Sequence, residues 1–548
     1  MESPTVAHVV GSTLAGLGVD TVFGLAGSGN FVVTNALVAG GARFHSSRHE
    51  GGAVAMADGW ARTTGRPGVV SVHQGPGLTN TLTSLAEAVK AHTPLVVLAG
   101  DTPAHALRSN FRIDQHDLVG AVGAAAELVY GVDSAAADAA RALRRAQLER
   151  RPVVLMMPID LAPRQAPAAA VEPQPLPVPP APAPEAIARA ADVLEAAERP
   201  AIVAGRGAVL ADARGAAEAL GERIGALLAT SAMANGLFAG LPYALGISGG
   251  FASPLAAELL ADSDVILALG ATLNHWTTRH GALVANARLI QVDVEPAAIG
   301  ANVAADVAIV GDAAATARAL AEELEARRHR ATGRRTPDLA EAIAARRWRD
   351  EPYEDAPPAD TIDPRTLAVA LDDLLPPDRA VAVDSGAFSG WPAMYLEVAD
   401  PRAWLFCNAF QSVGLGLGAA IGAAVARPGR ITVAALGDGG AFLALPELDT
   451  AARLRVPVLI VVWNDAAYGA EVHHFAPMGD PVEIAQFPDA DLAAIARGAG
   501  VPAHTVRHVD DLEPVAAWAA DPVGPLLVDA KVDPGVAGEW LKEAFRTG

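Results

Sequence analysis

Short apolar runs alternate with alanine-rich amphipathic stretches along the chain, and this alternation restricts the fold more than any other feature. Near the N-terminus, an apolar run at 68–72 is followed by an amphipathic stretch at 82–91 and by a second apolar run at 94–99. A short β-branched run favours a buried strand, whereas alanine and leucine at a helical period favour an amphipathic helix. Strands separated by helices are typical of parallel sheets covered by helices, so we expect an α/β fold.

The alternation recurs in two later parts of the chain. It is visible at 201–204, 265–269 and 289–294, and again at 431–436 and 458–462. A chain of 548 residues is too long for one hydrophobic core and fits about three domains. We therefore expect three consecutive parallel-sheet α/β domains, of which the first and third could share one fold.

Two breaks set the expected domain boundaries. The segment 163–184 is too rich in proline for a helix or a central strand, which predicts a linker. A second break covers about 327–364, where charged clusters surround prolines. The boundaries predicted from these breaks are 1–162, 185–330 and 360–548.

Composition excludes several classes of protein. Hydrophobic residues make up 51% and charged residues 19% of the chain, which is typical of a globular protein and not of a disordered one. The net charge of -21 repels phosphate backbones, and the short arginine-rich run 327–335 is interpreted as a solvated linker. We expect no nucleic-acid partner.

The compartment is predicted from the single cysteine and from the absence of targeting signals. Cys407 has no cysteine partner within the chain, which favours a reducing environment. The first twenty residues lack a signal-peptide pattern, and no apolar stretch reaches the roughly 18 residues of a membrane span. We expect a soluble cytoplasmic protein without a membrane partner.

The motif with the strongest chemical signal is Gly437-Asp438-Gly439-Gly440, which follows the apolar run 431–436 directly. Glycines at the carboxyl edge of a parallel sheet allow backbone amides to approach a phosphate, and an aspartate there can hold a divalent cation. By itself, Gly-Asp-Gly is also a common turn sequence.

A second polar segment follows the next predicted strand. The run 458–463 ends in Asn464-Asp465-Ala466-Ala467-Tyr468. Neighbouring parallel strands end at the same sheet edge, so Asp438 and a side chain from Asn464 or Asp465 are expected to meet there. With a backbone carbonyl, diphosphate oxygens and water, these ligands would complete the octahedral shell of Mg²⁺.

These motifs resemble the thiamine-diphosphate enzyme family that includes acetolactate synthase, pyruvate and benzoylformate decarboxylases and benzaldehyde lyase. The resemblance extends over essentially the whole chain. In that family a Gly-Asp-Gly segment and an Asn pair nearly thirty residues later bind the metal diphosphate. The resemblance implies Mg²⁺ ligation by Asp438, Asp465 and the Ala467 carbonyl; because Asp465 replaces the usual second Asn, Asn464 stays an alternative.

The resemblance also assigns the remaining parts of the cofactor site. Glu50, in Arg48-His49-Glu50-Gly51-Gly52, matches the family's Glu that hydrogen-bonds N1′ of the aminopyrimidine and so activates C2. Read without the family, Glu50 is an acidic residue at a helix N-terminus. Val413 matches the bulky aliphatic residue that bends the cofactor. The other residues implied to contact the cofactor are Gly386, Ala387, Gln411 and Tyr468.

Residues facing the substrate differ between members of the family. Ser28 and His73 match an active-site Ser and His of benzoylformate decarboxylase, and Gln115 resembles the Gln that contacts the reacting carbonyl in benzaldehyde lyase. Each could instead be an ordinary loop or strand-end residue. We interpret the enzyme as a carboligase that decarboxylates a 2-oxoacid and transfers the acyl unit to a second carbonyl, as acetolactate synthases do. The alternatives are a non-ligating decarboxylase, a C–C lyase or a non-catalytic binding protein of the same fold.

The resemblance carries two further implications. In the family the cofactor lies between the first and third domains of different subunits, which implies a homodimer or a homotetramer. FAD is a second candidate cofactor in the middle part, near Gly205-Arg206-Gly207, but Thr272 replaces an Arg often found there and a G-x-G-x-x-G pattern is absent. We therefore do not expect FAD.

Overall fold

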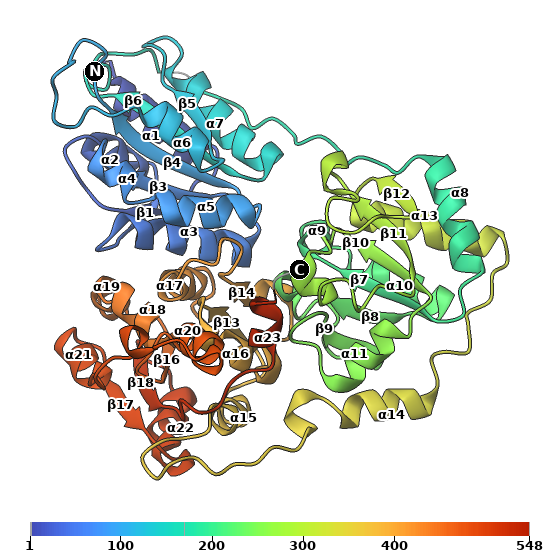
Figure 1. Ribbon diagram of the computed structural model, residues 1–548. Coiled ribbons are helices and arrows are strands. Elements are labelled where there is room, and N and C mark those ends of the chain that lie inside the picture. The colour runs from blue at the N-terminus through green and yellow to red at the C-terminus, as the bar shows by residue number, and fades with distance from the viewer. Residues whose placement is uncertain (1–2, 169, 547–548) are drawn as a thin grey trace.

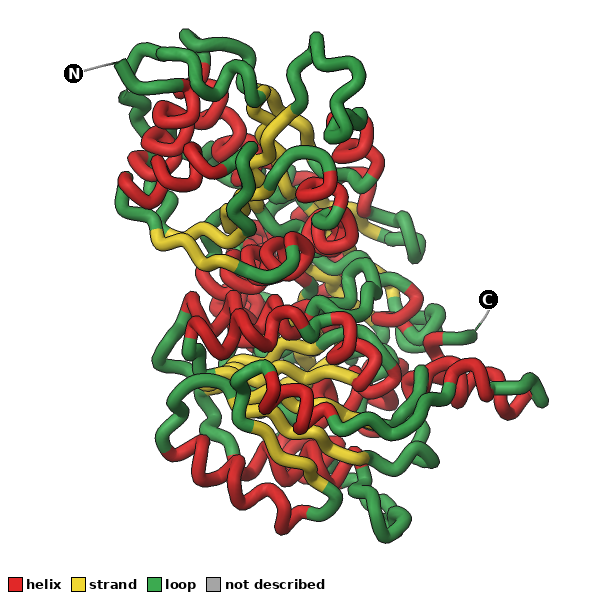
Figure 2. Tube along the Cα trace, turned by 90° about the vertical axis from the view of Figure 1, so that its left-hand side faces the viewer, coloured by secondary structure: helices red, strands yellow, loops and turns green. Residues whose placement is uncertain are grey.

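In the computed structural model, which describes residues 3–168 and 170–546, three six-stranded parallel sheets follow one another along the chain. We call the units built on them the first, middle and third domains. Figure 1 shows them as three lobes around a common centre, and Figure 2 shows helices on both sides of the strands. The expected α/β class with three parallel sheets is confirmed.

The first domain lies at the upper left of Figure 1. Its strands, in spatial order, are β2 (Arg43–Ser46), β1 (Thr21–Gly24), β3 (Gly68–Val72), β4 (Leu95–Asp101), β6 (Pro152–Pro158) and β5 (Ala125–Leu128). Its helices are α1 (Val6–Gly16), α2 (Phe31–Ala39), α3 (Glu50–Thr64), α4 (Pro76–Thr79), α5 (Leu82–Lys90), α6 (Gln115–Ala121) and α7 (Ala135–Glu149). The strands β3 and β4 are almost wholly apolar because helices cover both faces of the sheet.

The middle domain has a different strand order. Its strands are β12 (Val307–Val310), β11 (Arg288–Asp293), β10 (Val265–Leu269), β7 (Pro200–Ala204), β8 (Leu227–Thr230) and β9 (Ala244–Ile247). Its helices are α8 (Pro184–Glu195), α9 (Arg206–Leu210), α10 (Arg214–Ile224), α11 (Pro254–Ala261), α12 (His275–Thr278) and α13 (Ala313–Ala326). From its first strand the chain moves outward to one edge and then to the other, which is the doubly wound order of dinucleotide-binding folds.

The third domain repeats the topology of the first. Its strands are β14 (Trp404–Phe406), β13 (Arg379–Val383), β15 (Ile431–Gly437), β16 (Val458–Asn464), β18 (Leu526–Lys531) and β17 (Ala503–Val506). Its helices are α15 (Pro364–Leu374), α16 (Gly390–Tyr395), α17 (Gly416–Ala426), α18 (Asp438–Leu443), α19 (Pro446–Leu454), α20 (Gly469–Phe475), α21 (Leu492–Gly498), α22 (Glu513–Ala520) and α23 (Trp540–Ala544). In both domains the second strand lies outside the first, and the sixth lies inside the fifth.

The two connections differ from each other. Residues 163–183, apart from the undescribed residue 169, contain no helix, in line with their proline content. The second break contains α14 (Pro337–Ala345), a helix that the sequence reading missed. Thr336 caps its first turn and Pro337 stands at its first position, yet none of its residues is buried.

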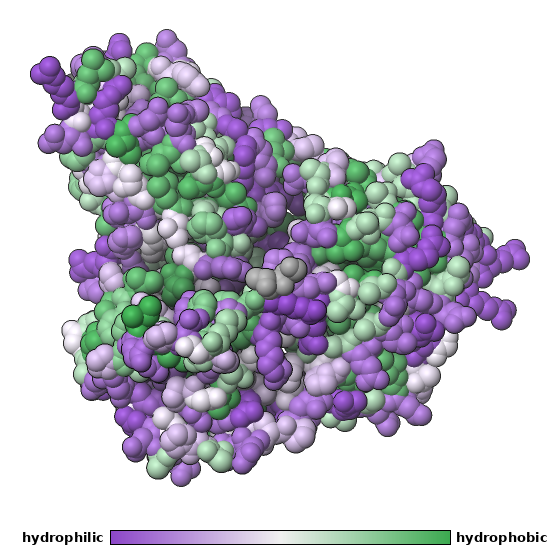
Figure 3. Space-filling view, viewed as in Figure 1, coloured by the Kyte–Doolittle hydropathy of each residue, from purple (hydrophilic) through white to green (hydrophobic). Residues whose placement is uncertain are grey.

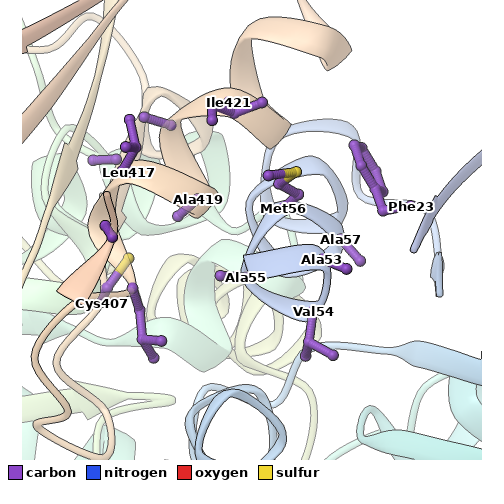
Figure 4. Close-up of a cluster of buried hydrophobic side chains, with 14 of the residues drawn as sticks. Phe23, Ala53, Val54, Ala55, Met56, Ala57, Cys407, Leu417, Ala419 and Ile421 are labelled. Atoms are coloured by element: carbon purple, nitrogen blue, oxygen red, sulfur yellow. The ribbon is translucent and has the colours of Figure 1, made fainter. Parts of the chain in front are cut away.

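The first and third domains pack on each other through the equivalent helices α3 and α17 (Figure 1). A Cβ at Gly59 would collide with the Ala419 carbonyl, and one at Gly422 would collide with the Met56 carbonyl. Glycine at these two positions allows the backbones to approach. Figure 4 shows buried side chains from both helices, among them Ala55 and Met56 of α3 and Leu417 and Ala419 of α17, together with the buried Cys407.

A buried ion network joins the same two domains. The guanidinium of Arg62 contacts Asp58 at 2.9 Å and Glu87 at 3.1 Å, and it donates to the Phe406 carbonyl at 3.0 Å. All three charged side chains are at most 4% exposed. Breaking such a buried network leaves an uncompensated charge, so these residues fix how the domains meet.

Candidate active site

The third domain gathers one set of predicted site residues at the carboxyl edge of its sheet. They surround a cavity of about 900 Å³, which is also lined by middle-domain residues and by the end of α5. The visible face of the molecule is hollowed where the three domains meet (Figure 3). The predicted residues that line the cavity are Gly386, Ala387, Gln411, Val413, Gly437, Asp438, Gly439, Gly440, Asp465, Ala467 and Tyr468.

Asp438 and Asp465 face each other in this cavity. Asp438 is the first residue of α18, after β15, and Asp465 follows the neighbouring strand β16, so the two strand ends bring their carboxyl groups into hydrogen-bond contact. Burial raises the pKa of both groups, and for Asp465 the charge of Asp438 raises it further. Within the described residues, no Lys, Arg or His side chain lies within 4.0 Å of either carboxylate.

This donor set fits a divalent cation. No group of three or more His, Cys, Asp or Glu side chains suited to a metal occurs in the described part of the chain. Mg²⁺ is commonly held by only one or two carboxylates, with phosphate oxygens and water as its other ligands. Two facing carboxylates without a protein cation are such a pair, and the neighbouring glycines 437, 439 and 440 leave room for a diphosphate.

Asn464 points elsewhere. Its amide donates to Asp529 at 2.8 Å, and its carbonyl oxygen accepts from the Ala466 amide at 3.1 Å. Because Asn464 ends a buried strand while Asp465 belongs to the following turn, the two side chains differ in direction. The geometry favours Asp465 over Asn464 as the side chain that would join Asp438 in binding a metal ion.

The contribution of Asp438 and Asp465 to the stability of the metal-free protein is expected to fall as pH rises from about 4, the ordinary aspartate pKa, to neutrality. The folded-state pKa values of Asp438 and Asp465 are raised, so their contribution is complete below the ordinary value and is lost as both groups ionise. Asp465→Asn, which removes the facing charge, should lose less stability over this range, and Mg²⁺ should restore stability to the parent protein.

Thermal unfolding in EDTA and in Mg²⁺ from pH 4 to pH 8 measures this difference. Other titrating groups, including Asp384, whose pKa burial raises to about 6, are common to both proteins and cancel in the comparison. Identical pH profiles for the parent and Asp465→Asn would contradict the paired-carboxylate assignment.

The first domain gathers a second set of predicted residues on loops equivalent to those of the third. Ser28 follows β1 and His73 follows β3, as Ala387 follows β13 and Asp438 follows β15. The Ser28 hydroxyl lies 3.2 Å from Nε2 of His73, whose Nδ1 lies 2.7 Å from the Gln74 carbonyl. If Nδ1 carries the proton, Nε2 accepts from the serine.

Glu50 belongs to this first-domain set. It is the first residue of α3, and its Oε2 accepts from the Asn80 amide at 2.9 Å. The other oxygen, Oε1, lies close to Gly77, since a Cβ built at Gly77 would be 3.5 Å from it and 3.1 Å from Cβ of His73. One carboxylate oxygen is thereby fixed while the second stays available to a ligand.

Gln115 is closed off from the site. Its Oε1 accepts from the Gly75 amide at 2.7 Å, and its Nε2 donates to the Gly100 carbonyl and to Asp101. With 4% exposure, the side chain has no free polar group for a substrate. The geometry favours Gln115 as a support of the turn at Gly75, where φ is +64°.

The two sets do not line the same cavity. None of the first-domain residues Ser28, Glu50, His73 or Gln115 lines the cavity that Asp438 and Val413 share. Large apolar side chains are exposed beside both sets: Phe31 and Phe111 in the first domain, and Phe442, Leu443 and Tyr468 in the third. Within one chain the two sets therefore remain apart.

In the middle domain, the amides of two turn glycines are already paired. Gly205 donates to the Leu269 carbonyl and Gly207 to the Gly270 carbonyl, each at 2.9 Å. The two glycine loops thus bond to each other. Phosphates are bound by unpaired amides at such turns, so the amides of these two glycines are not available to a dinucleotide phosphate.

Sequence reasoning missed two buried carboxylates near the cavity, Glu87 and Asp384. Glu87 accepts from the backbone of 409 and 410, and Asp384 accepts from the backbone of 414 to 416. Asp384 directly follows β13, at the same sheet edge as Asp438, which is the signal that could have identified it.

Comparison with known proteins gives matches in all three domains. The model "Thiamine pyrophosphate enzyme, N-terminal TPP binding domain" matches residues 4–122, the corresponding central-domain model matches 187–320, and the C-terminal TPP binding domain model matches 384–530.

In the described residues, no helix is long and apolar enough to cross a membrane.

Curated relatives resemble nearly the whole chain. Sulfoacetaldehyde acetyltransferase from Castellaniella defragrans is 30% identical over 95% of this chain and 90% of its own length. Probable 2-ketoarginine decarboxylase from Pseudomonas aeruginosa is 31% identical over 93% of this chain and 90% of its own length. The acetolactate synthase large subunit from Parasynechococcus marenigrum is 31% identical over 82% of this chain and 74% of its own length.

Proposed function

The chain belongs to the thiamine pyrophosphate enzyme family, and we propose that it is a Mg²⁺-dependent carboligase, which decarboxylates a 2-oxoacid and transfers the acyl unit to a second carbonyl. The observation that supports this most directly is the facing pair Asp438 and Asp465 beside a glycine turn. When bound, thiamine diphosphate supplies a nucleophilic carbon and an electron sink.

The third domain would bind and orient the diphosphate end. Asp438, Asp465 and the Ala467 carbonyl would hold Mg²⁺, and the amides of the glycine turn would approach the phosphates. Val413 lines the same cavity and is 40% exposed, so its branched side chain is available to support the bend between the two rings.

The first domain would supply the proton chemistry. Glu50 would exchange a proton with N1′ of the aminopyrimidine through Oε1, while Asn80 holds Oε2. His73 and Ser28, 3.2 Å apart, would transfer protons to and from the substrate oxygen or carbon.

A second copy of the chain would complete the site. Since Glu50 and Asp438 belong to separate half-sites within one chain, a partner's first domain would cover the third-domain cavity. The exposed Phe442 and Leu443 on one half, and Phe31 on the other, are suited to such burial. We therefore propose a homodimer, or a homotetramer built from two such dimers. We propose that it acts in the cytoplasm.

Room for a second substrate favours ligation. The cavity of about 900 Å³ extends from Val413 to Lys90 and Arg206, beyond the turn that would hold the diphosphate. A non-ligating decarboxylase is the second candidate, because the Ser28–His73 pair matches that class and because one relative is a probable 2-ketoarginine decarboxylase. FAD is not part of the proposal.

Product analysis separates these candidates. Purified protein with Mg²⁺ and thiamine diphosphate is incubated with pyruvate or benzoylformate, with and without an aldehyde acceptor, and products are identified by mass spectrometry. A 2-hydroxyketone or 2-hydroxyacid together with CO₂ is expected. An aldehyde as the only product, at any acceptor concentration, would assign the non-ligating decarboxylase instead.

A further inference from the structure

The segment between β14 and α17 contains a strained residue at the cofactor cavity. Gln411 has a φ of +60°, in the left-handed region, which is strained for a residue with a side chain. Gln411 and Val413 both line the cavity. Such a conformation persists only where surrounding contacts fix it, and buried carboxylates hold the residues on either side.

Glu87 holds the N-terminal side of the segment. Its Oε1 accepts from the Ala409 amide at 3.1 Å, and its Oε2 accepts from the Phe410 amide at 2.6 Å. The carboxylate is 2% exposed and is also paired with Arg62. Charge-assisted hydrogen bonds of this kind are stronger than neutral ones, and their cost of burial is offset by the arginine.

Asp384 holds the C-terminal side. Its carboxylate accepts from the amides of Gly414, Leu415 and Gly416 at 2.8, 3.0 and 3.2 Å, respectively. The side chain is fully buried. A Cβ at Gly440 would collide with Oδ2 of Asp384, so the same carboxylate also lies against the glycine turn that follows β15.

Three residues, 411–413, lie between these two anchors. Within the described residues, the amides of 411, 412 and 413 donate to no protein group, whereas five amides flanking them donate to the two carboxylates. The fixed amides on either side determine where residues 411–413 lie, and two of these residues, Gln411 and Val413, line the cavity.

We propose that Glu87 and Asp384 are positioning residues, which hold residues 411–413 in the strained conformation that a bent cofactor requires. The inference rests on the proposed function, because it concerns the cofactor of that site. Glu87 belongs to the first domain and the segment to the third, so the shape of the cofactor loop also depends on how these domains of one chain pack. Arg62, which bonds both Glu87 and the Phe406 carbonyl, links the two.

The test uses Glu87→Gln and Asp384→Asn in the full-length protein. The matched control is Asp138→Asn, which alters another buried carboxylate that accepts a backbone amide, that of Tyr130, and pairs with Arg141. The first readout is amide hydrogen exchange of the cofactor-free protein. Both variants should raise exchange in the peptide 407–416, and Asp138→Asn should not.

The second readout is the rate at which the C2 proton of bound thiamine diphosphate exchanges with solvent. This rate is measured by acid quench at set times and NMR. We expect it to slow about 10- to 100-fold in Glu87→Gln and Asp384→Asn, since misplacement by about 1 Å has effects of this size. The control should exchange at the parent rate. If Glu87→Gln does not fold, Asp384→Asn provides the same comparison.

Two results would overturn the inference. Loosening of the peptide 407–416 without a change in C2 exchange would show that the carboxylates support the fold alone, and unaltered amide exchange would show that they do not hold the segment. A third result, failure of the parent protein to bind thiamine diphosphate, would contradict the proposed function itself and can be told apart from the two results above.

Discussion

Glu50→Gln is expected to lower kcat about 10²- to 10⁴-fold, the range that a positioned acid or base contributes. Glutamine keeps an oxygen that can accept from Asn80, as Oε2 of Glu50 does at 2.9 Å, but it cannot exchange a proton with N1′ of the cofactor. Folding and cofactor affinity should change little. CO₂ release under saturating cofactor measures the loss, and thermal unfolding of the cofactor-free protein measures the fold.

Glu149→Gln is a suitable control for this substitution. Glu149 is a partly exposed acid of the same domain, paired with Arg145 and Arg151, with no contact to the site. It should keep the parent kcat. A parent-like kcat in Glu50→Gln would remove Glu50 from the catalytic assignment, even if the cofactor still binds.

Asp438→Ala is expected to weaken Mg²⁺-dependent cofactor binding by about 2 kcal/mol or more, equivalent to a factor of about 30 or more in concentration. The substitution removes one of the two facing carboxylates and leaves Asp465 alone opposite the diphosphate. A Mg²⁺ titration at fixed thiamine diphosphate, followed by tryptophan fluorescence, measures the shift; the buried Trp463 lines the cavity.

Asp373→Ala controls for the loss of an acidic residue. Asp373 belongs to the same domain and is exposed in a surface pair with Arg349, which is expected to contribute little. If the Mg²⁺ titration has the same midpoint in Asp438→Ala as in the parent protein, the metal binds elsewhere.

The parts of the fold that follow from local pattern were predictable from the sequence. The runs at 431–436 and 458–462 became the paired parallel strands β15 and β16, because apolar β-branched residues suit a doubly covered sheet. The helix α14 was missed because its neighbouring prolines were read as a break, although Thr336 and Pro337 are start signals for a helix.

The facing carboxylates, which we propose as metal ligands, were predictable from the sequence to within one residue. Spacing placed Asn464 and Asp465 after the strand, but spacing alone could not determine which side chain turns toward Asp438. The choice depends on Asp529, 65 residues later, which engages Asn464. Gln115 is similar, because its bonds to Gly75 and Gly100 depend on how β3 and β4 end.

Contacts between distant segments were beyond the sequence reading. Glu87 and Ala409 are separated by more than 300 residues, and nothing in the local pattern of α5 distinguishes a buried acid from a surface acid. The separation of Glu50 from Asp438 in one chain likewise depends on three-dimensional placement. These long-range features determine how the site is assembled, whereas local motifs determine which groups it contains.

The central claim is tested most directly by CO₂ release from a 2-oxoacid by the purified parent protein, with thiamine diphosphate and Mg²⁺ each present or omitted after dialysis against EDTA. We predict release from pyruvate or benzoylformate only when both are present. Release that is independent of thiamine diphosphate, or a protein that binds no thiamine diphosphate at millimolar Mg²⁺, would contradict the account.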